Sequence, residues 1–360
     1  MKAIIKRELK NYLKNPILWI GLAFILFELF QILNPYLQIR YVQSEQDTAG
    51  KEPENIADAD ITEGYVLSTE EQRMDLACGL LQEEMQERLS MTKEEAGEIV
   101  EEMRRQNLDA EEMADYLSEN YGFYPYYGPK YYYEISEFHK GTVEEVNAYL
   151  RENLEEHTYS FYLGRKFADF GGLFLAFFAM ILLAFLFIRD TKRDTWELLH
   201  TKPVGDAAYI CGKILGGFLS MVFLWGILTL LFGGLCELQG RRCGFPVNFG
   251  EFVWIAAIYI LPTMLMITCV YTAVALIFKN PLPGVPCLFL YLIYSNMGSR
   301  GPDGSFGYYG RPLAIMVRFP GRFFETTPPP LVLLNQSFLV IASVCITFCA
   351  VWIWKRRRVY

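Results

Sequence analysis

Long apolar runs constrain this chain more than any other feature of its sequence. A helix that crosses the ~30 Å hydrocarbon core of a bilayer needs about 20 apolar residues, because each residue rises ~1.5 Å. Six runs are candidates, of which 285–297 is short; the others are 17–33, 171–188, 207–235, 252–278 and 331–354. The sequence therefore predicts an all-α membrane protein with six transmembrane helices.

The N-terminus combines a basic amphipathic stretch with an uncleaved anchor. Lys2, Lys6, Lys10 and Lys14 recur every four residues. We expect residues 1–16 to form a cytoplasmic interfacial helix whose apolar side enters the lipid; that side consists of Ile5, Leu9, Tyr12 and Leu13. The alternative is a plain basic flank of the first span. No small-residue cleavage site follows the apolar run, so residues 17–37 are expected to remain as the first span.

An acidic block separates the first two spans. Residues 41–167 carry 30 Asp and Glu against 11 Lys and Arg, whereas the rest of the chain carries 11 acids and 22 bases. Within the block, Thr92 with Glu95, Asp109 with Glu112 and Thr142 with Glu145 have the spacing of helix capping boxes. Residues 69–89 show helical periodicity. We therefore predict a mainly helical domain over residues 38–167.

Lys and Arg near the span ends predict the orientation in the membrane. Their excess on alternate loops places both termini and the loop 189–213 in the cytoplasm, and residues 38–167 outside the cell. The membrane region of five further spans covers residues 168–360. Its segment 298–330 is then external, and we expect it to dip back into the membrane because it mixes Gly, Pro and apolar residues.

The loop 189–213 has the features of a helix that docks into a partner. Asp194 and Glu197 have cap spacing, and Pro203 disfavours helix at the preceding residue. Trp196, Leu198 and Leu199 cannot all be hidden in so short a helix, and an apolar face beside charges is typical of groove docking. The alternative is an interfacial turn with the tryptophan at headgroup level.

This loop resembles the cytoplasmic coupling loop of ABC-2 type permeases, the membrane subunits of ATP-binding cassette exporters. The resemblance rests on 195–199, on 202–204 and on 212–215, and it extends over residues 1–37 and 168–360 but not over 38–167. It implies cytosolic ABC ATPase subunits as partners and a second permease in a homodimer or heterodimer. The residues that would contact the ATPase are Asp194, Thr195, Trp196, Glu197, Leu198, Leu199, His200, Lys202 and Pro203.

The chain lacks the sequence of a nucleotide site. A phosphate-binding loop needs GxxxxGK followed by Ser or Thr, but six residues separate Gly205 from Gly212, and Ile214 follows the lysine. We therefore expect ATP and magnesium to bind in the partner ATPase. In this chain we expect no catalytic residue, metal or cofactor, and its partners are protein subunits and membrane lipid rather than nucleic acid.

Two other groups of residues are candidate sites. Glu28 and Gln31 lie on one side of the first span and could line the translocation path; the alternative is a protonated glutamate bonded to a neighbouring helix. An aromatic run could form an external ligand surface, or instead pack inside its domain; its tyrosines are Tyr124, Tyr126, Tyr127, Tyr131, Tyr132 and Tyr133. Cys236 and Cys243 flank a predicted external loop, and a disulfide between them is left open.

Together these features favour a permease subunit of an ABC exporter that moves an amphiphilic substrate, such as a peptide, a lipid-like molecule or a drug, across the cell membrane. A membrane-anchored sensor or scaffold that binds an extracellular ligand is the alternative. An ion-coupled carrier or channel ranks third, because only Glu28 is a convincing charged residue within a span.

Overall fold

The computed structural model describes residues 1–47, 59–124, 128–188, 190, 204–297, 299–300, 306–307 and 311–358. The chain forms two compact units. The helical bundle comprises Met1–Gln38 and His157–Tyr360, and the insert domain comprises Ile39–Glu156.

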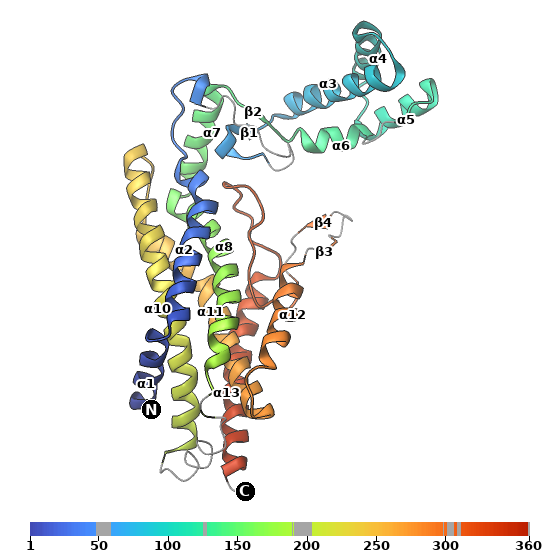
Figure 1. Ribbon diagram of the computed structural model, residues 1–360. Helices are drawn as coiled ribbons and strands as arrows, with labels where there is room; N and C mark the ends of the chain where they lie inside the picture. Colours follow the sequence, from blue (N-terminus) through green and yellow to red (C-terminus); the bar gives the residue numbers. More distant parts are fainter. Residues whose placement is uncertain are drawn as a thin grey trace. The chain divides into compact units, whose positions relative to one another are not determined.

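Among the described residues of the bundle, five helices are long and apolar enough to cross a membrane (Figure 1). They are α2 (Pro16–Leu37), α8 (Tyr159–Leu182), α10 (Asp206–Cys243), α11 (Phe249–Phe278) and α13 (Val332–Arg358). A 3-10 turn, η4 (Leu183–Phe185), extends α8. The helix α12 (Gly284–Asn296) is apolar but has 13 residues, which rise only about 20 Å. The predicted all-α membrane fold is confirmed, and α12 corresponds to the apolar run that was predicted to be short.

Local signals start these helices. The side chain of Asn15 caps α2 by accepting from the Ile17 N–H at 3.1 Å, and Pro16 occupies the first helical position. Thr158 caps α8 in the same way, at 3.1 Å from the Phe161 N–H. The α8 helix therefore begins well before the apolar run that predicted it at residue 171.

Aromatic packing centres the bundle on α8, α10 and α11. The Phe167 ring lies 5.1 Å from the Phe252 ring and 5.7 Å from the Phe232 ring, and all three side chains are buried. Outward faces of α2 and α13 instead expose large apolar residues, including Phe27 and Phe348. Exposed apolar faces on such long helices are typical of segments surrounded by lipid.

The helix α10 corrects one expectation about the cysteines. It continues through Cys243 and ends at Gly244, whose φ of 72° is left-handed. Cys236 and Cys243 therefore lie seven residues apart on one helix, about 10 Å along its axis, which is too far for a disulfide. Both are free cysteines. The loop predicted between them is wrong because the polar residues 237–242 extend the helix instead of ending it.

The irregular segment 311–330 packs into the bundle through backbone hydrogen bonds. Thr263 of α11 donates to the Ile315 carbonyl at 2.5 Å, and Ser295 of α12 accepts from the Ile315 N–H at 2.9 Å. Asp169 of α8 accepts from the Phe319 N–H at 3.0 Å and forms an ion pair with Arg318. Whether this segment re-enters the membrane stays a prediction. Before it, β3 (Ser299–Arg300) and β4 (Phe306–Gly307) pair antiparallel.

The insert domain is mainly helical, as predicted. Its helices are α3 (Glu70–Leu89), α4 (Lys93–Arg105), α5 (Ala110–Tyr121), α6 (Gly128–Ile135) and α7 (Val143–Glu156). Two short turns, η1 (Glu45–Asp47) and η3 (Ile61–Glu63), precede them. The strands β1 (Tyr65–Leu67) and β2 (Phe138–Lys140) pair antiparallel, with Val66 opposite His139.

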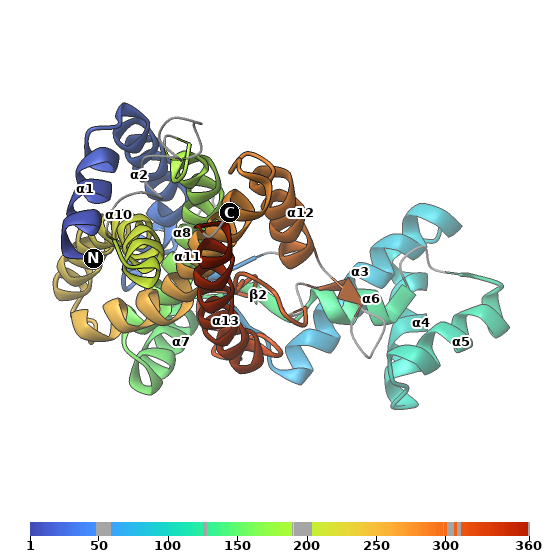
Figure 2. The same ribbon diagram turned by 90° about the horizontal axis from the view of Figure 1, so that it is seen from below.

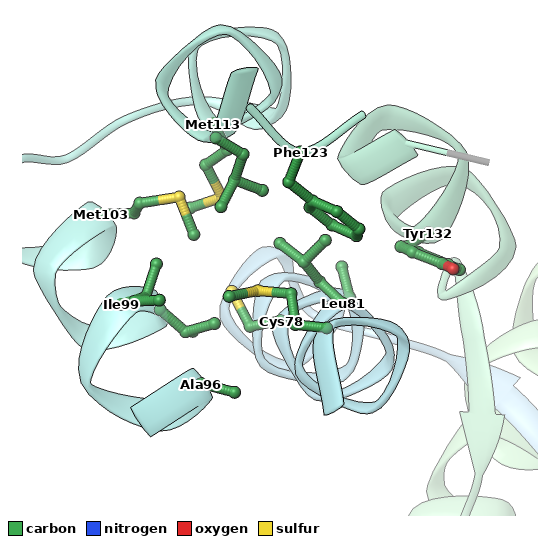
Figure 3. Packing of buried hydrophobic residues seen from close by; sticks show 12 residues of the cluster. Cys78, Leu81, Ala96, Ile99, Met103, Met113, Phe123 and Tyr132 are labelled. Atoms are coloured by element: carbon green, nitrogen blue, oxygen red, sulfur yellow. The ribbon is translucent and has the colours of Figure 1, made fainter. Parts of the chain in front are cut away.

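Capping boxes and one apolar cluster shape this domain. The predicted boxes at Thr92, Asp109 and Thr142 all form, because each cap side chain and its glutamate bond reciprocally to backbone N–H groups. Figure 3 shows Leu81, Met103 and Phe123 pointing toward one another in the cluster formed by α3, α4, α5 and the residues after α5. These helices therefore share one core.

Candidate functional site

The predicted coupling residues 194–203 lie outside the described residues, but the two ends of their loop are described. Asp190 stands at the end that follows α8 and η4, and α10 begins at Asp206. The base of the loop is therefore the part of the predicted coupling region that the structure describes.

At this base, the N-terminal helix α1 (Lys2–Leu13) packs directly against α10, as Figure 2 shows. Two glycines one turn apart on α10 permit the close approach. A Cβ added at Gly212 would lie 3.0 Å from Cγ2 of Ile4, and one added at Gly216 would lie 2.5 Å from Cβ of Glu8. Glycines spaced by four residues let helix backbones approach closely in membrane proteins. The contact therefore depends on the absence of side chains at these two positions.

A buried charge cluster joins α1, α10 and the start of the loop; it consists of Glu8, Asp190, Tyr209 and Lys213. The Lys213 ammonium lies 3.0 Å from Glu8 Oε1, forms an ion pair with Asp190 and donates to the Leu186 carbonyl at 3.2 Å. The Tyr209 hydroxyl donates to Asp190 Oδ2 at 2.9 Å. All four residues are buried.

The electrostatics of this cluster make Lys213 its central residue. Two carboxylates share one ammonium group, and burial makes an uncompensated charge costly. The hydroxyl of Tyr209 supplies a further hydrogen bond to the second carboxylate. Burial, together with the nearby carboxylates Glu8 and Asp190, holds the pKa of the Tyr12 hydroxyl well above its ordinary value. The tyrosine therefore remains neutral at physiological pH.

A cavity of about 330 Å³ adjoins the cluster. Side chains of Arg7, Tyr12 and Lys14 line it, and residues 185–188 close it on the side of α8. The buried hydroxyl of Tyr12 has no hydrogen-bond partner within the described part of the chain. The cavity therefore leaves one buried polar group unsatisfied beside the ion cluster.

The structure places the predicted interfacial residues between α10 and the surface. Tyr12 is buried, whereas Ile5, Leu9 and Leu13 are half-buried. The prediction that this helix lies in the membrane interface is not tested, but its inward side carries Glu8 as well as apolar residues. On α2, Glu28 is half-buried and Gln31 is exposed. Their role in a translocation path stays a prediction.

The predicted tyrosine surface divides between the core and the exterior of the insert domain. Tyr124 is 71% exposed, and Tyr131 is also exposed. Tyr132 is buried and donates to Glu84 Oε2 at 2.6 Å, while the half-buried Tyr133 ring lies 4.1 Å from the Arg73 guanidinium. Tyr126 and Tyr127 lie outside the described residues. Tyr132 at least has the packing role of the alternative interpretation.

Sequence reasoning missed Glu8, Asp190 and Tyr209 as members of a site, and it noted Lys213 only within the family pattern. Two signals were present. Glu8 is the one acid among the first 27 residues, in an otherwise basic helix. Gly212 and Gly216 have the spacing that permits close helix packing. Neither signal identifies the partner helix, which requires the fold.

Comparison with known proteins assigns the chain to a family. The family model described as ABC-2 family transporter protein matches residues 2–302, which include the N-terminal helix, the loop and the charge cluster. No curated protein and no solved structure matches the chain. The match covers most of the chain, and the chain therefore belongs to the ABC-2 family of transporter proteins, a family of multi-pass membrane subunits that associate with ABC ATPases.

Proposed function

We propose that this chain is the permease subunit of an ABC exporter that moves an amphiphilic substrate out of the cell. The observation that carries the mechanism is the buried charge cluster, because it ties the start of the loop to both α1 and α10. The substrate class is a peptide, a lipid-like molecule or a drug. Family membership supports the permease role, and the direction of transport belongs to the proposal.

In the proposed mechanism, separate cytosolic ATPases bind ATP and magnesium and press on the loop 191–203 and on α1. The charge cluster then passes this displacement to α8 through Asp190 and to α10 through Lys213. Such a contact moves as a rigid body because buried ion pairs resist separation. Two permeases, identical or related, would rotate against each other and open a path along their interface, with Glu28 and Gln31 of α2 beside it.

The test is purification of the full chain from its native membrane. We expect an ATPase of the P-loop class to copurify and to hydrolyse ATP in the complex. Replacing Gly216→Ala should lower this hydrolysis, because the added Cβ would lie 2.5 Å from Cβ of Glu8 and must displace α1. Absence of any copurifying ATPase would exclude the proposal.

Gly226→Ala is the matched control for this experiment. Gly226 lies on the same helix, but a Cβ added there would meet nothing within 4 Å. Both variants remove one glycine from α10, so they share any effect of helix propensity. A decrease of ATP hydrolysis that is equal in the two variants would show that the α1 contact does not transmit the motion.

A further inference from the structure

The cavity of about 330 Å³ beside the charge cluster is lined by side chains that the proposed coupling role does not use. It lies between α1, the first residues of α2 and residues 185–188. All of its lining residues belong to the helical bundle. Because the long apolar helix α2 begins at this cavity, the cavity lies where a membrane surface would meet the chain.

A polar stripe of α1 faces this cavity. Arg7, Asn11 and Lys14 line it, and their spacing of i, i+4 and i+7 places them on one side of the helix. Arg7 and Lys14 are exposed, and neither cationic group forms an ion pair within the part of the chain that the structure describes. Lys10 is also exposed on α1, but it does not line the cavity.

The charges of the lining do not cancel. In the charge cluster, the ammonium of Lys213 stands against the carboxylates of Glu8 and Asp190, which leaves a charge of −1. Arg7 and Lys14 add two positive charges, so the described lining has a net charge of +1. A ligand with one negative charge would neutralise it. A phosphodiester carries one such charge, and guanidinium and ammonium groups are common partners of phosphate oxygens.

Tyr12 supplies a buried hydroxyl at the same cavity. Its side chain lines the cavity and is 4% exposed. The hydroxyl makes no hydrogen bond to any described residue. A buried donor without an acceptor is unfavourable, so a ligand oxygen that accepts from this hydroxyl would stabilise the bound state.

Apolar residues beside the cavity favour a lipid over a free ion. Leu186 and Ile188 line it together with Phe185, which is 41% exposed. One turn into α2, Trp19 is 47% exposed and its indole N–H donates to the Leu13 carbonyl at 2.9 Å. Tryptophan is enriched at the headgroup level of membranes. The cavity therefore lies at the level of α2 where lipid headgroups are expected.

We propose that this cavity binds the phosphate group of an anionic lipid headgroup. Arg7 and Lys14 hold the phosphate oxygens, the Tyr12 hydroxyl donates to a glycerol or ester oxygen, and the acyl chains leave past Phe185. Ligand sites have volumes of roughly 300–1,000 Å³, so about 330 Å³ accommodates a headgroup but not a whole lipid. The proposal depends on α2 crossing the membrane, and not on the substrate or the direction of transport.

The experiment measures lipid binding to the full chain in detergent, without an ATPase. Native mass spectrometry and thermal-shift titration compare phosphatidylglycerol with phosphatidylcholine, whose choline group cancels the phosphate charge. Phosphatidylglycerol should bind more tightly. Lys14→Gln should weaken this binding about tenfold, because it removes one charge-assisted hydrogen bond. Lys10→Gln is the matched control, because it removes the same charge from the same helix outside the cavity, and its affinity should be unchanged.

Tyr12→Phe distinguishes lost binding from lost folding. The substitution keeps the ring and removes the buried hydroxyl, so the lipid-free chain should be at least as stable as the unsubstituted chain. Its affinity for phosphatidylglycerol should nevertheless fall severalfold. A variant that lost affinity by misfolding would lose thermal stability as well.

Inorganic phosphate tests the other source of the same chemical group. It should not displace phosphatidylglycerol; displacement would identify a free phosphate ion as the ligand and overturn the assignment to a lipid. The proposal is also overturned if phosphatidylglycerol binds no more tightly than phosphatidylcholine, or if Lys14→Gln and Lys10→Gln bind it equally well. An unchanged affinity in Tyr12→Phe would overturn it too. None of these measurements involves the ATPase, so such a failure is distinct from a failure of the proposed function.

Discussion

Lys213 is the residue on which the base of the loop depends. Its ammonium compensates two buried carboxylates, those of Glu8 and Asp190. Replacing Lys213→Met would keep the length of the side chain but leave both carboxylates uncompensated. Breaking a buried ion pair in this way costs about 3–5 kcal/mol. We expect a loss of that size in the free energy of unfolding, measured for the full chain in detergent by denaturant titration.

Glu8→Gln provides the comparison for this prediction. The substitution removes one of the two carboxylates, so Lys213 and Asp190 remain as a neutral pair, and the glutamine amide oxygen can still accept from the ammonium. The loss of stability should be clearly smaller than for Lys213→Met. Equal losses in the two variants would contradict the view that charge balance, and not packing, governs the cluster.

At the residue scale, the sequence predicts which segments form helices better than it predicts which side chains contact one another. The basic helix at residues 2–14 was recognisable, yet the direction in which Glu8 points depends on α10, which lies some 200 residues further along the chain. Tyr12 was expected in lipid, whereas its side chain is buried beside the charge cluster. Burial of a polar side chain is a tertiary property that periodicity in one helix cannot reveal.

At the element scale, local signals predicted the helices of the insert domain well. Capping boxes at Thr92, Asp109 and Thr142 specify helix starts within four residues, and the structure confirms each start. The sequence predicted the ends of helices less reliably. The α10 helix extends beyond its apolar run to Cys243 because charged residues such as Glu237 and Arg241 form an i,i+4 pair that continues the helix.

The capping boxes of α4 and α7 should weaken in acid. The pKa values of Glu95 and Glu145 lie below their ordinary value, chiefly because the backbone N–H groups of Thr92 and Thr142 donate to these carboxylates. A lowered folded-state pKa stabilises the fold above the unfolded pKa, and this stability is lost as pH falls from the ordinary glutamate pKa of about 4.3 through the folded pKa. Hydrogen exchange in the first turns of both helices should then accelerate, after correction for intrinsic rates.

The first turn of α3 is an internal control for this acid effect. Its capping box pairs Thr69 with Gln72, and the glutamine does not titrate. Protection in the first turn of α3 should therefore remain while protection in α4 and α7 decreases. If all three turns lose protection together, the domain unfolds globally and the caps are not the acid-sensitive elements.

At the scale of the whole molecule, charge and hydropathy were sufficient to separate the two units. The acidic residues between the first two spans indicated an inserted domain, and the chain contacts place its limits at Ile39 and Glu156. The packing of residues 311–330 could not be worked out in the same way. These residues have neither helical nor strand periodicity, and their position depends on single contacts such as Asp169 with Arg318.

The orientation of the molecule in the membrane can be tested with two cysteine substitutions. Tyr124 is 71% exposed in the insert domain, and Lys10 is exposed on α1. Loop charge predicts that residue 124 is extracellular and residue 10 is cytoplasmic. A membrane-impermeant maleimide applied to intact cells should label Tyr124→Cys above the background of the unsubstituted chain. Lys10→Cys should be labelled only after the membrane is permeabilised.

The reverse pattern would contradict both the predicted topology and the mechanism that depends on it. The charge cluster joins α1 to the start of the loop, so residue 10 and residue 190 must lie on the same side of the membrane. Labelling of Lys10→Cys from outside would therefore place the loop outside as well. A cytosolic ATPase could not then reach the loop. Labelling confined to permeabilised cells would instead place the contact between α1 and α10 on the side of the membrane where the ATPase binds.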